Sequence, residues 1–438
     1  MALPQIALPA GYRWRTLTPD DRRLATELDT WAFPSGISHE DLDSTASPLT
    51  WERVIGIEAD GFDGLAALHA SYPFEHFPVP GAELPTAGLT WVGVHPQHRR
   101  RGLLTAMIDL HLARSAERGE PLSALFAAEA AIYGRFGYGH AADDLRLDIP
   151  RGAALRDVPG AERHTVRIEV ASREGHGSLV DRLHRAAGAA PTGTPGINRP
   201  GWVTRETEEL QATFWDDSPF HRGGRESRRI IVAELDGEPR GYVTFRRTLN
   251  WEATGPRGRV HAGEVVAVDA AAARALWGAL LDLDLTNEVT PFTLPVDDVV
   301  TQLLVNLRAA APRTPDNLWV RLVDVAAALA GRQYAADVDV TLGVTDSRLP
   351  ANTGTYRLQA EAFGAASVER VDPEFEAPEL SLDVRELGAA YLGGKSLAAL
   401  AAAGLVTDHT RPGQGRGALA RASTAFGWPV APGSSWVF

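Results

Sequence analysis

Residues 88–115 read GLTWVGVHPQHRRRGLLTAMIDLHLARS, and they decide the fold class. The apolar run at 87–94 is typical of a buried strand, and a basic turn containing Gly102 follows it. Apolar residues then recur at helical spacing until Gly119, which is a helix stop signal. The apolar face of this helix consists of Leu104, Met107, Ile108 and Leu112. A strand at 122–127 would return parallel to the first, which predicts a right-handed βαβ unit.

The turn between this strand and helix has the features of an anion site. The first backbone N–H groups of a helix lack partners within it and lie at the positive end of its dipole. Gly102 allows close backbone approach, and Arg99, Arg100 and Arg101 can form charge-assisted hydrogen bonds to phosphate oxygens. Neither a Walker motif nor the three-glycine dinucleotide fingerprint is present. The turn therefore predicts a diphosphate site; the alternative is a solvated basic loop at a helix entry.

Composition excludes several classes of function. The chain has 438 residues, a formal net charge of -13 and no cysteine. The charge argues against nucleic-acid binding and favours a cationic small molecule, while the missing thiols exclude disulfides and thiolate metal sites. There is no apolar run of about 18 residues or more, and residues 1–10 lack the features of a signal peptide. We therefore expect a cytoplasmic enzyme with no membrane partner.

The remaining sequence predicts three domains, at 1–150, 151–312 and 313–438. The segment 145–149 is expected to close the first domain, and the proline-bounded residues 312–315 look like a linker. The expected elements are strands at 12–17, 51–58, 65–71, 145–149, 230–234, 241–246, 261–268 and 338–344, and helices at 270–285, 396–405 and 418–426. The strands at 51–58 and 65–71 are expected to pair as a hairpin across the turn at Asp60-Gly61, and the alternation at 338–344 is typical of a half-exposed antiparallel strand.

Two motifs together indicate a family. HRRRGLL at 98–104, followed by IYGRFGYG at 132–139, resembles the enhanced intracellular survival (Eis) family of GNAT N-acetyltransferases. The resemblance implies an α/β (α+β) fold with tandem GNAT-like mixed sheets, flanking helices and a small C-terminal sterol-carrier-protein-like domain. It also implies acetyl-CoA-dependent acetylation of amines on aminoglycosides, polyamines or lysine side chains, by direct transfer in a ternary complex, and a homo-oligomer that is a hexamer. In the second domain the arginines and glycine are replaced at 269–272, so its site is expected to be degenerate.

The resemblance also assigns the residues that hold acetyl-CoA. The strand backbone at Val92, Gly93 and Val94 would bind the pantetheine arm as an added strand would. The diphosphate would lie on Arg99, Arg100, Arg101, Gly102, Leu103, Leu104 and Thr105, with Ala128 and Glu129 along the other side of the cofactor. Leu104 and Ala128 depart from the family pattern, in which small residues and serine respectively are common. Ala128 therefore offers no side-chain hydroxyl to the cofactor.

Two groups are assigned to catalysis by the same resemblance. Tyr133 matches the general acid that protonates the departing thiolate, and a phenol of pKa ~10 is a reasonable donor. The terminal carboxylate, here that of Phe438, would assist deprotonation of the amine. The alternatives are that Tyr133 belongs to an aromatic packing cluster with Phe136 and Tyr138, and that the apolar C-terminus is a frayed tail.

Substrate recognition is the least specific part of the sequence. Asp29, Trp31, Phe33 and Trp91 could line a pocket for a polyamine through acidic and aromatic contacts, or could equally be core and surface residues. No metal site is predicted, because the histidines lack carboxylates at ligand spacing. Gly413, Gly415 and Gly417 are interpreted as a linker into the last helix.

Two other functions remain open. The chain could be a lipid-binding carrier or scaffold in which the acyltransferase domain is a relic. It could also be an N-acyltransferase that uses another donor, such as propionyl-CoA or succinyl-CoA.

Overall fold

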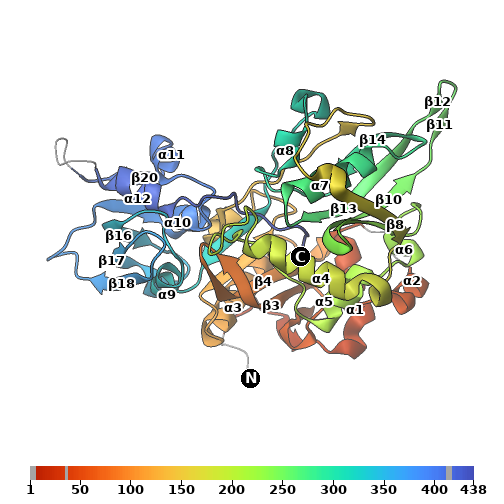
Figure 1. Cartoon of the computed structure of the whole chain (residues 1–438). Helices are drawn as coiled ribbons and strands as arrows, with labels where there is room; N and C mark the ends of the chain where they lie inside the picture. The colour runs from red at the N-terminus through yellow and green to blue at the C-terminus, as the bar shows by residue number, and fades with distance from the viewer. Residues whose placement is uncertain (1–5, 35–37, 411–416) are drawn as a thin grey trace.

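The computed structural model describes residues 6–34, 38–410 and 417–438, and within them the strands form three main sheets (Figure 1). The third sheet lies to one side of the other two, at the left of Figure 1. The C-terminus ends in the middle of the molecule, between the first and second sheets. The first and third sheets share one large apolar core cluster, whereas the second sheet packs around a separate one. No described helix is long and apolar enough to cross a bilayer.

The first sheet contains the predicted βαβ unit. Its order is β1 (Tyr12–Thr16), β2 (Ile55–Ala59), β3 (Ala67–Val79), β4 (Ala82–Val94), β5 (Leu122–Phe126), β15 (Leu318–Leu322) and β6 (Gly139–His140). Its helices are α1 (Arg22–Ala32), α2 (His39–Ser44) and α3 (Leu103–Glu117). The parallel pairing of β4 with β5 across α3, and the antiparallel pairing of β2 with β3, confirm the predictions from the sequence.

β4 and β5 separate soon after they pair. They pair only at 86–88 of β4 and 122–124 of β5, although both strands continue further. β4 also carries a bulge, because Leu68 pairs with Gly93 whereas Ala70 pairs with Thr90, which leaves two β4 residues opposite one β3 residue. Trp91 lies in this bulge with a φ of 52°. The bulge and the splayed strands open the edge of the sheet where a ligand could insert.

The first sheet is completed by a strand from far along the chain. β15 lies between β5 and β6 and is antiparallel to both, although the sequence analysis assigns its residues to the third domain. The segment expected to close the first domain behaves differently from the prediction. β7 (Ile149–Pro150) pairs with β14 of the second sheet, and Leu145, Leu147 and Ile149 pack in that sheet's core. The apolar alternation at 145–149 could not distinguish between the two sheets.

The second sheet repeats the mixed topology. Its order is β7, β14 (Thr286–Pro291), β13 (Gly258–Ala267), β10 (Glu238–Thr248), β9 (Arg229–Leu235) and β8 (His164–Val170). Its helices are α4 (Arg173–Ala189), α5 (Glu208–Trp215), α6 (Pro219–Arg222), α7 (Ala270–Leu281) and α8 (Val300–Leu303), and β11 (Trp251–Glu252) with β12 (Gly255–Pro256) forms a hairpin.

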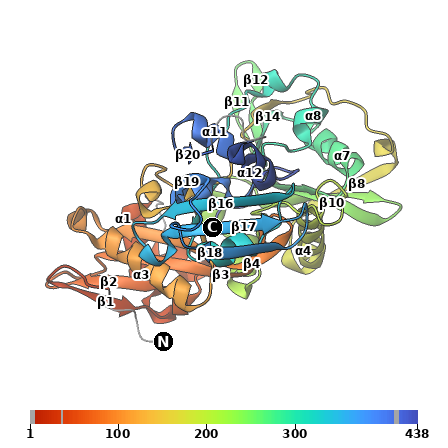
Figure 2. The same ribbon diagram turned by 90° about the vertical axis from the view of Figure 1, so that its left-hand side faces the viewer.

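The third sheet faces the viewer in Figure 2. Its order is β18 (Ala366–Val371), β17 (Gly354–Ala360), β16 (Val338–Thr345), β19 (Leu380–Asp383) and β20 (Val406–Asp408), with helices α9 (Val325–Ala330), α10 (Val384–Tyr391), α11 (Leu397–Ala402) and α12 (Ala418–Phe426). β16 is antiparallel to β17, as predicted, but parallel to β19. Of the predicted glycine linker, Gly413 and Gly415 lie outside the described residues, and Gly417 is the N-cap of α12.

Candidate active site

A cavity of about 530 Å³ lies between the end of β4 and the start of α3. It brings together most of the residues predicted to bind the cofactor: Val92, Gly93, Val94, Arg99, Arg100, Gly102, Leu103, Leu104, Thr105, Ala128 and Glu129, together with Tyr133. Arg101 is not in the lining, because its guanidinium donates to the Tyr12 hydroxyl over 3.0 Å. Four further residues in the same lining were not predicted from the sequence: Ala32, His98, Ile132 and Arg135. We call this space the donor cavity.

The N-terminus of α3 gives the donor cavity its anion site. Gly102 caps the helix with a φ of 83°, and no side chain bonds to the first turn. The first intrahelical bond runs from the Ala106 amide to the Gly102 carbonyl, so the three preceding amides have no partner within the helix. Arg99 and Arg100 are exposed, and no described carboxylate lies within ion-pair distance of either. Unpaired amides and uncompensated guanidinium groups in one cavity fit a diphosphate.

The free edge of β4 fits the rest of such a cofactor. Because β5 pairs only with 86–88, the backbone of β4 beyond Gly88 has no described strand on that side. Gly93 lies against α1, where an added Cβ would come 3.1 Å from the Cβ of Ala32. An amide-bearing chain such as pantetheine can therefore pair with this edge as a strand would.

Tyr133 lies in the donor cavity on the one-turn 3-10 helix at Tyr133–Phe136. Its side chain is 9% exposed, and its ring meets that of Tyr138 edge-on at 5.9 Å. Burial, with a smaller contribution from Glu129, raises the pKa of Tyr133 to about 12. The phenol therefore stays protonated at neutral pH, which is the form that a general acid needs.

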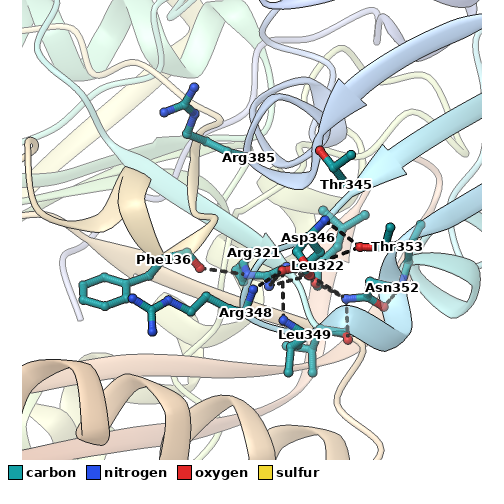
Figure 3. Close-up of polar contacts among 12 residues, drawn as sticks. Phe136, Arg321, Leu322, Thr345, Asp346, Arg348, Leu349, Asn352, Thr353 and Arg385 are labelled. Carbon is teal, nitrogen blue, oxygen red and sulfur yellow. Dashed lines mark hydrogen bonds and ion pairs between the residues drawn. The ribbon is translucent and has the colours of Figure 1, made fainter.

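A buried ion pair fixes the turn that carries Tyr133 (Figure 3). Arg321 of β15 donates from Nε to the Phe136 carbonyl over 3.0 Å, and its terminal nitrogen forms two bonds of 2.6 and 2.8 Å to Asp346. Both side chains of this pair are almost fully buried. Asp346 also accepts from the amide of Leu349 and from the side chain of Asn352, each over 3.0 Å. This network ties the turn to the loop after β16.

A second cavity, of about 750 Å³, lies on the other side of the β4 bulge, and we call it the acceptor cavity. Its lining includes Trp91 from the bulge and residues 435–438 of the C-terminus. Phe438 is 8% exposed, and its ring packs against Phe74 at 4.8 Å and Phe126 at 5.1 Å. Gly88 makes room for this packing, because a Cβ there would lie 2.2 Å from the Phe74 ring. The C-terminus is therefore packed into the core rather than frayed.

The linings of the two cavities come within one or two residues of each other along the chain where β4 and β5 separate. Trp91 lines the acceptor cavity and the adjacent Val92 lines the donor cavity. Likewise, Phe126 contacts Phe438, whereas Ala128, two residues later, lines the donor cavity. A thioester in one cavity and a nucleophile in the other would thus approach each other across this gap.

The acceptor cavity is strongly basic, which the sequence analysis missed. Among the described residues its lining includes Arg146, Arg205, Arg225, Arg228, Arg246, His221, His261 and Glu264. Several of these come from the second sheet: Arg246 is on β10 and Glu264 is on β13. The available signal was a charged residue within an otherwise apolar strand, but it does not reveal which cavity the charge faces.

The four predicted substrate residues are not brought into one pocket. Trp91 lines the acceptor cavity and Phe33 the donor cavity. Trp31 is 55% exposed and lines a separate surface hollow, where it meets His95 edge-on. Asp29 belongs to neither cavity lining, and burial raises the pKa of its carboxyl to about 6.

The start of α7, next to the second sheet, carries a negative charge where the start of α3 is preceded by arginines. Asp269 caps α7 by accepting from the Ala272 amide over 2.8 Å, and its other oxygen accepts from Arg240. A carboxylate thus covers amides that are open at α3, which disfavours a phosphate there. Among the described residues, no group of three or more His, Asp or Glu side chains is placed to hold a metal ion.

Comparison with known proteins identifies the domains. Residues 13–141 and 201–322 each match an acetyltransferase (GNAT) domain family, and residues 325–434 match the sterol carrier protein domain family. The tandem GNAT fold with a C-terminal sterol-carrier-like domain is therefore confirmed.

Similar proteins cover most of the chain. A Streptomyces avermitilis protein named an uncharacterized N-acetyltransferase is 39% identical over 95% of this chain and 97% of its own. The N-acetyltransferase Eis of Mycobacterium tuberculosis is 33% identical over 74% of this chain and 75% of its own. The crystal structure of Eis1 from Mycobacterium abscessus superposes with a TM-score of 0.77 at 30% identity, covering 97% of this chain and 100% of that one. The chain therefore belongs to the Eis-like family of GNAT N-acetyltransferases, and it is an acyltransferase.

Proposed function

We propose that the protein transfers an acetyl group from acetyl-CoA directly to an amine held in the same ternary complex. The observation that carries this proposal is that adjacent residues of the β4 bulge line the donor and acceptor cavities, with Tyr133 in one cavity and the C-terminus in the other. The absence of cysteine supports direct transfer, because no thiol is available to carry the acyl group.

In this proposal the N-terminus of α3 and the arginines before it hold the diphosphate, and the edge of β4 holds the pantetheine arm. Acetyl-CoA supplies the thioester. The amine nitrogen bonds to the carbonyl carbon and the carbon–sulfur bond breaks. Tyr133 donates its hydroxyl proton to the departing sulfur, and the carboxylate of Phe438 attracts the proton that the amine loses.

The class of amine is a separate question. The family resemblance implies a polycationic acceptor, such as an aminoglycoside, a polyamine or a lysine side chain, and the net charge of -13 supports it. The arginines of the acceptor cavity do not support it, because they would repel a polycation.

Steady-state kinetics tests the core of the proposal. Varying acetyl-CoA against several amines while following free thiol should give intersecting initial-velocity patterns, whereas a covalent acyl-enzyme gives parallel ones. Faster turnover with propionyl-CoA or succinyl-CoA would assign another donor. If no donor and amine pair releases free thiol and the protein retains a bound lipid, the carrier or scaffold function is favoured.

The proposal also includes a homo-oligomer, a hexamer by family resemblance, and a cytoplasmic location, where acetyl-CoA is made. Edge strand β8 supports assembly, because Val166, Ile168 and Val170 expose an apolar row at 43%, 47% and 60%. Light scattering coupled to gel filtration should give a mass above that of one chain, and Ile168→Glu should lower it.

A further inference from the structure

We propose that the acceptor cavity selects an amine that also carries an oxyanion, a carboxylate or a phosphate, and that Arg225 and Arg228 bind this oxyanion. The inference rests on the proposed function and specifies its substrate class. It starts from the charges in the cavity lining, where five described arginines accompany one described acidic side chain, Glu264, and the terminal carboxylate of Phe438.

Three of these arginines are already neutralised. Arg205 donates to Glu264 over 2.9 Å, Arg146 pairs with Asp144 over 2.5 Å, and Arg246 donates to Asp217. Both carboxylate oxygens of Glu264 already have donors, because Glu264 also accepts hydrogen bonds from the hydroxyl groups of Tyr242 over 2.6 Å and Ser435 over 2.8 Å. Although burial opposes its ionisation, Arg205 and His184 lower the pKa of Glu264 to about 2. Among the described lining residues, only the terminal carboxylate of Phe438 is left for an amine-rich ligand.

Arg225 and Arg228 are the two lining arginines without a carboxylate at ion-pair distance among the described residues. Arg225 donates from Nε to the Arg222 carbonyl over 2.8 Å, and Arg228 donates to the carbonyls of Phe214 and Asp216. A guanidinium held by backbone carbonyls keeps its full positive charge, and an oxyanion is its natural partner.

The pKa values of two basic groups in the cavity are consistent with this excess of positive charge. Burial, and then Arg246, lowers the pKa of Arg228 to about 10. Burial, and then Arg225, lowers the pKa of His261 as well. An anion placed among these groups would relieve their mutual repulsion, whereas a polycation would increase it.

The aromatic side chains of the cavity lead to the same conclusion. Aromatic faces bind cationic amines, but guanidinium groups already lie over three of the aromatic rings in this lining. Arg205 lies 3.9 Å from the Phe214 centroid and 5.0 Å from that of Trp436, and Arg146 lies 5.2 Å from that of Phe292. Phe214, Trp436 and Phe292 therefore already hold a cation of the protein itself.

Competition between matched amines tests the proposal. Phosphoethanolamine and glutamate carry the oxyanion; ethanolamine and glutamine are their uncharged counterparts, and kanamycin and spermidine represent polycations. With acetyl-CoA saturating, the kcat/KM of the wild type for at least one anionic amine should exceed that for its uncharged counterpart about tenfold or more. A preference for phosphoethanolamine would identify the oxyanion as a phosphate, and a preference for glutamate would identify it as a carboxylate. Higher kcat/KM for the polycations than for every anionic amine would overturn the proposal.

Variants locate the preference. Arg225→Gln should remove the preference for the anionic amine, because kcat/KM for that amine should fall about 10- to 100-fold while KM for acetyl-CoA is unchanged. Arg225→Glu should shift the preference toward spermidine. Arg182→Gln, at an exposed position of α4 outside the lining, is the matched control and should change nothing. If Arg225→Gln instead abolishes only a preference for succinyl-CoA, the oxyanion belongs to the donor and the proposal is wrong.

A binding experiment separates this inference from the proposed function. With CoA filling the donor cavity, glutarate or inorganic phosphate should raise the melting temperature of the wild type but not of Arg225→Gln. Such a rise without any acetylation would retain the oxyanion site and reject the transferase. Acetylation without anion preference or anion binding would retain the transferase and reject the oxyanion site.

Discussion

Gly102 and Tyr133 show how single residues carry the chemistry of the donor cavity. Gly102 reverses the chain at a positive φ and leaves the first turn of α3 uncapped, which opens its amides to a ligand. Tyr133 is held in its protonated form by burial. Gly102 is predictable from a short motif, because a helix start after a basic turn is a local feature, whereas the role of Tyr133 follows only from the family resemblance of residues 132–139. The arginines of the acceptor cavity were not predicted, because they come from segments far apart in the sequence.

Removing the Tyr133 hydroxyl should slow the reaction without weakening donor binding. We expect Tyr133→Phe to lower kcat by roughly 10² to 10⁴ while KM for acetyl-CoA changes little, because only the proton donor is lost. The raised pKa also means that wild-type kcat should not fall between pH 7 and 10 through loss of this proton. Tyr138→Phe is the control: its hydroxyl bonds to Ser123, and it is outside the cavity lining. Equal turnover in Tyr133→Phe and wild type would remove Tyr133 from the mechanism.

The two glycines that flank α3, Gly102 and Gly119, allow anion binding to be tested separately from helix stability. Gly102 and Gly119 have φ values of 83° and 72°, and an added Cβ would meet no atom within 4 Å at either position. Alanine at such a φ costs roughly 1–2 kcal/mol through backbone strain alone. Both alanine variants should therefore lose similar stability, but only Gly102→Ala should raise the dissociation constant for acetyl-CoA in calorimetry. Equal dissociation constants would mean that the turn does not bind the diphosphate.

At the level of elements, the local βαβ unit was predictable and the long-range strand order was not. β4, α3 and β5 follow one another along the chain, so turn signals and apolar spacing defined them. The local sequence of β15 does not indicate which strands it pairs with, and only the structure shows that it lies between β5 and β6. The same ambiguity explains why 145–149 was assigned to the first sheet although β7 pairs with β14.

The ion pair between β15 and the loop after β16 should be essential for the packing of these elements. Asp346→Asn leaves Arg321 buried without a counter-charge, and we expect the free energy of unfolding to fall by roughly 3–5 kcal/mol. Urea unfolding measures this change. Asp339→Asn breaks the exposed pair with Arg357 in the same domain and should have little effect. If both variants unfold alike, the network in Figure 3 does not stabilise the interface.

For the whole molecule, buried histidines should make the fold sensitive to acid. Burial lowers the pKa of His69 to about 3 and that of His184 to about 4, and it also lowers the pKa of His111. The unfolded chain binds these protons near the ordinary pKa of ~6.5, so their contribution to stability is complete above that pH and is lost as the pH falls toward the folded values. Burial raises the pKa of Asp298 to about 6, which offsets part of this loss.

The melting temperature should therefore fall steadily from pH 7 to pH 4. The melting temperature of His184→Gln should fall less steeply than that of the wild type, because the variant lacks one of the histidines whose pKa is lowered by folding. His76→Gln, at an exposed position, should follow the wild-type curve. A melting temperature that is flat or rises over this range would contradict the assignment of neutral buried histidines.

The account as a whole depends on the donor cavity binding acetyl-CoA through the start of α3. Titration calorimetry of the full chain with acetyl-CoA tests this most directly. We predict one site per chain, affinity that weakens with rising salt because charged contacts contribute, and a large loss of affinity in the double variant Arg99→Ala/Arg100→Ala. No heat of binding to the wild type at millimolar acetyl-CoA would contradict the account.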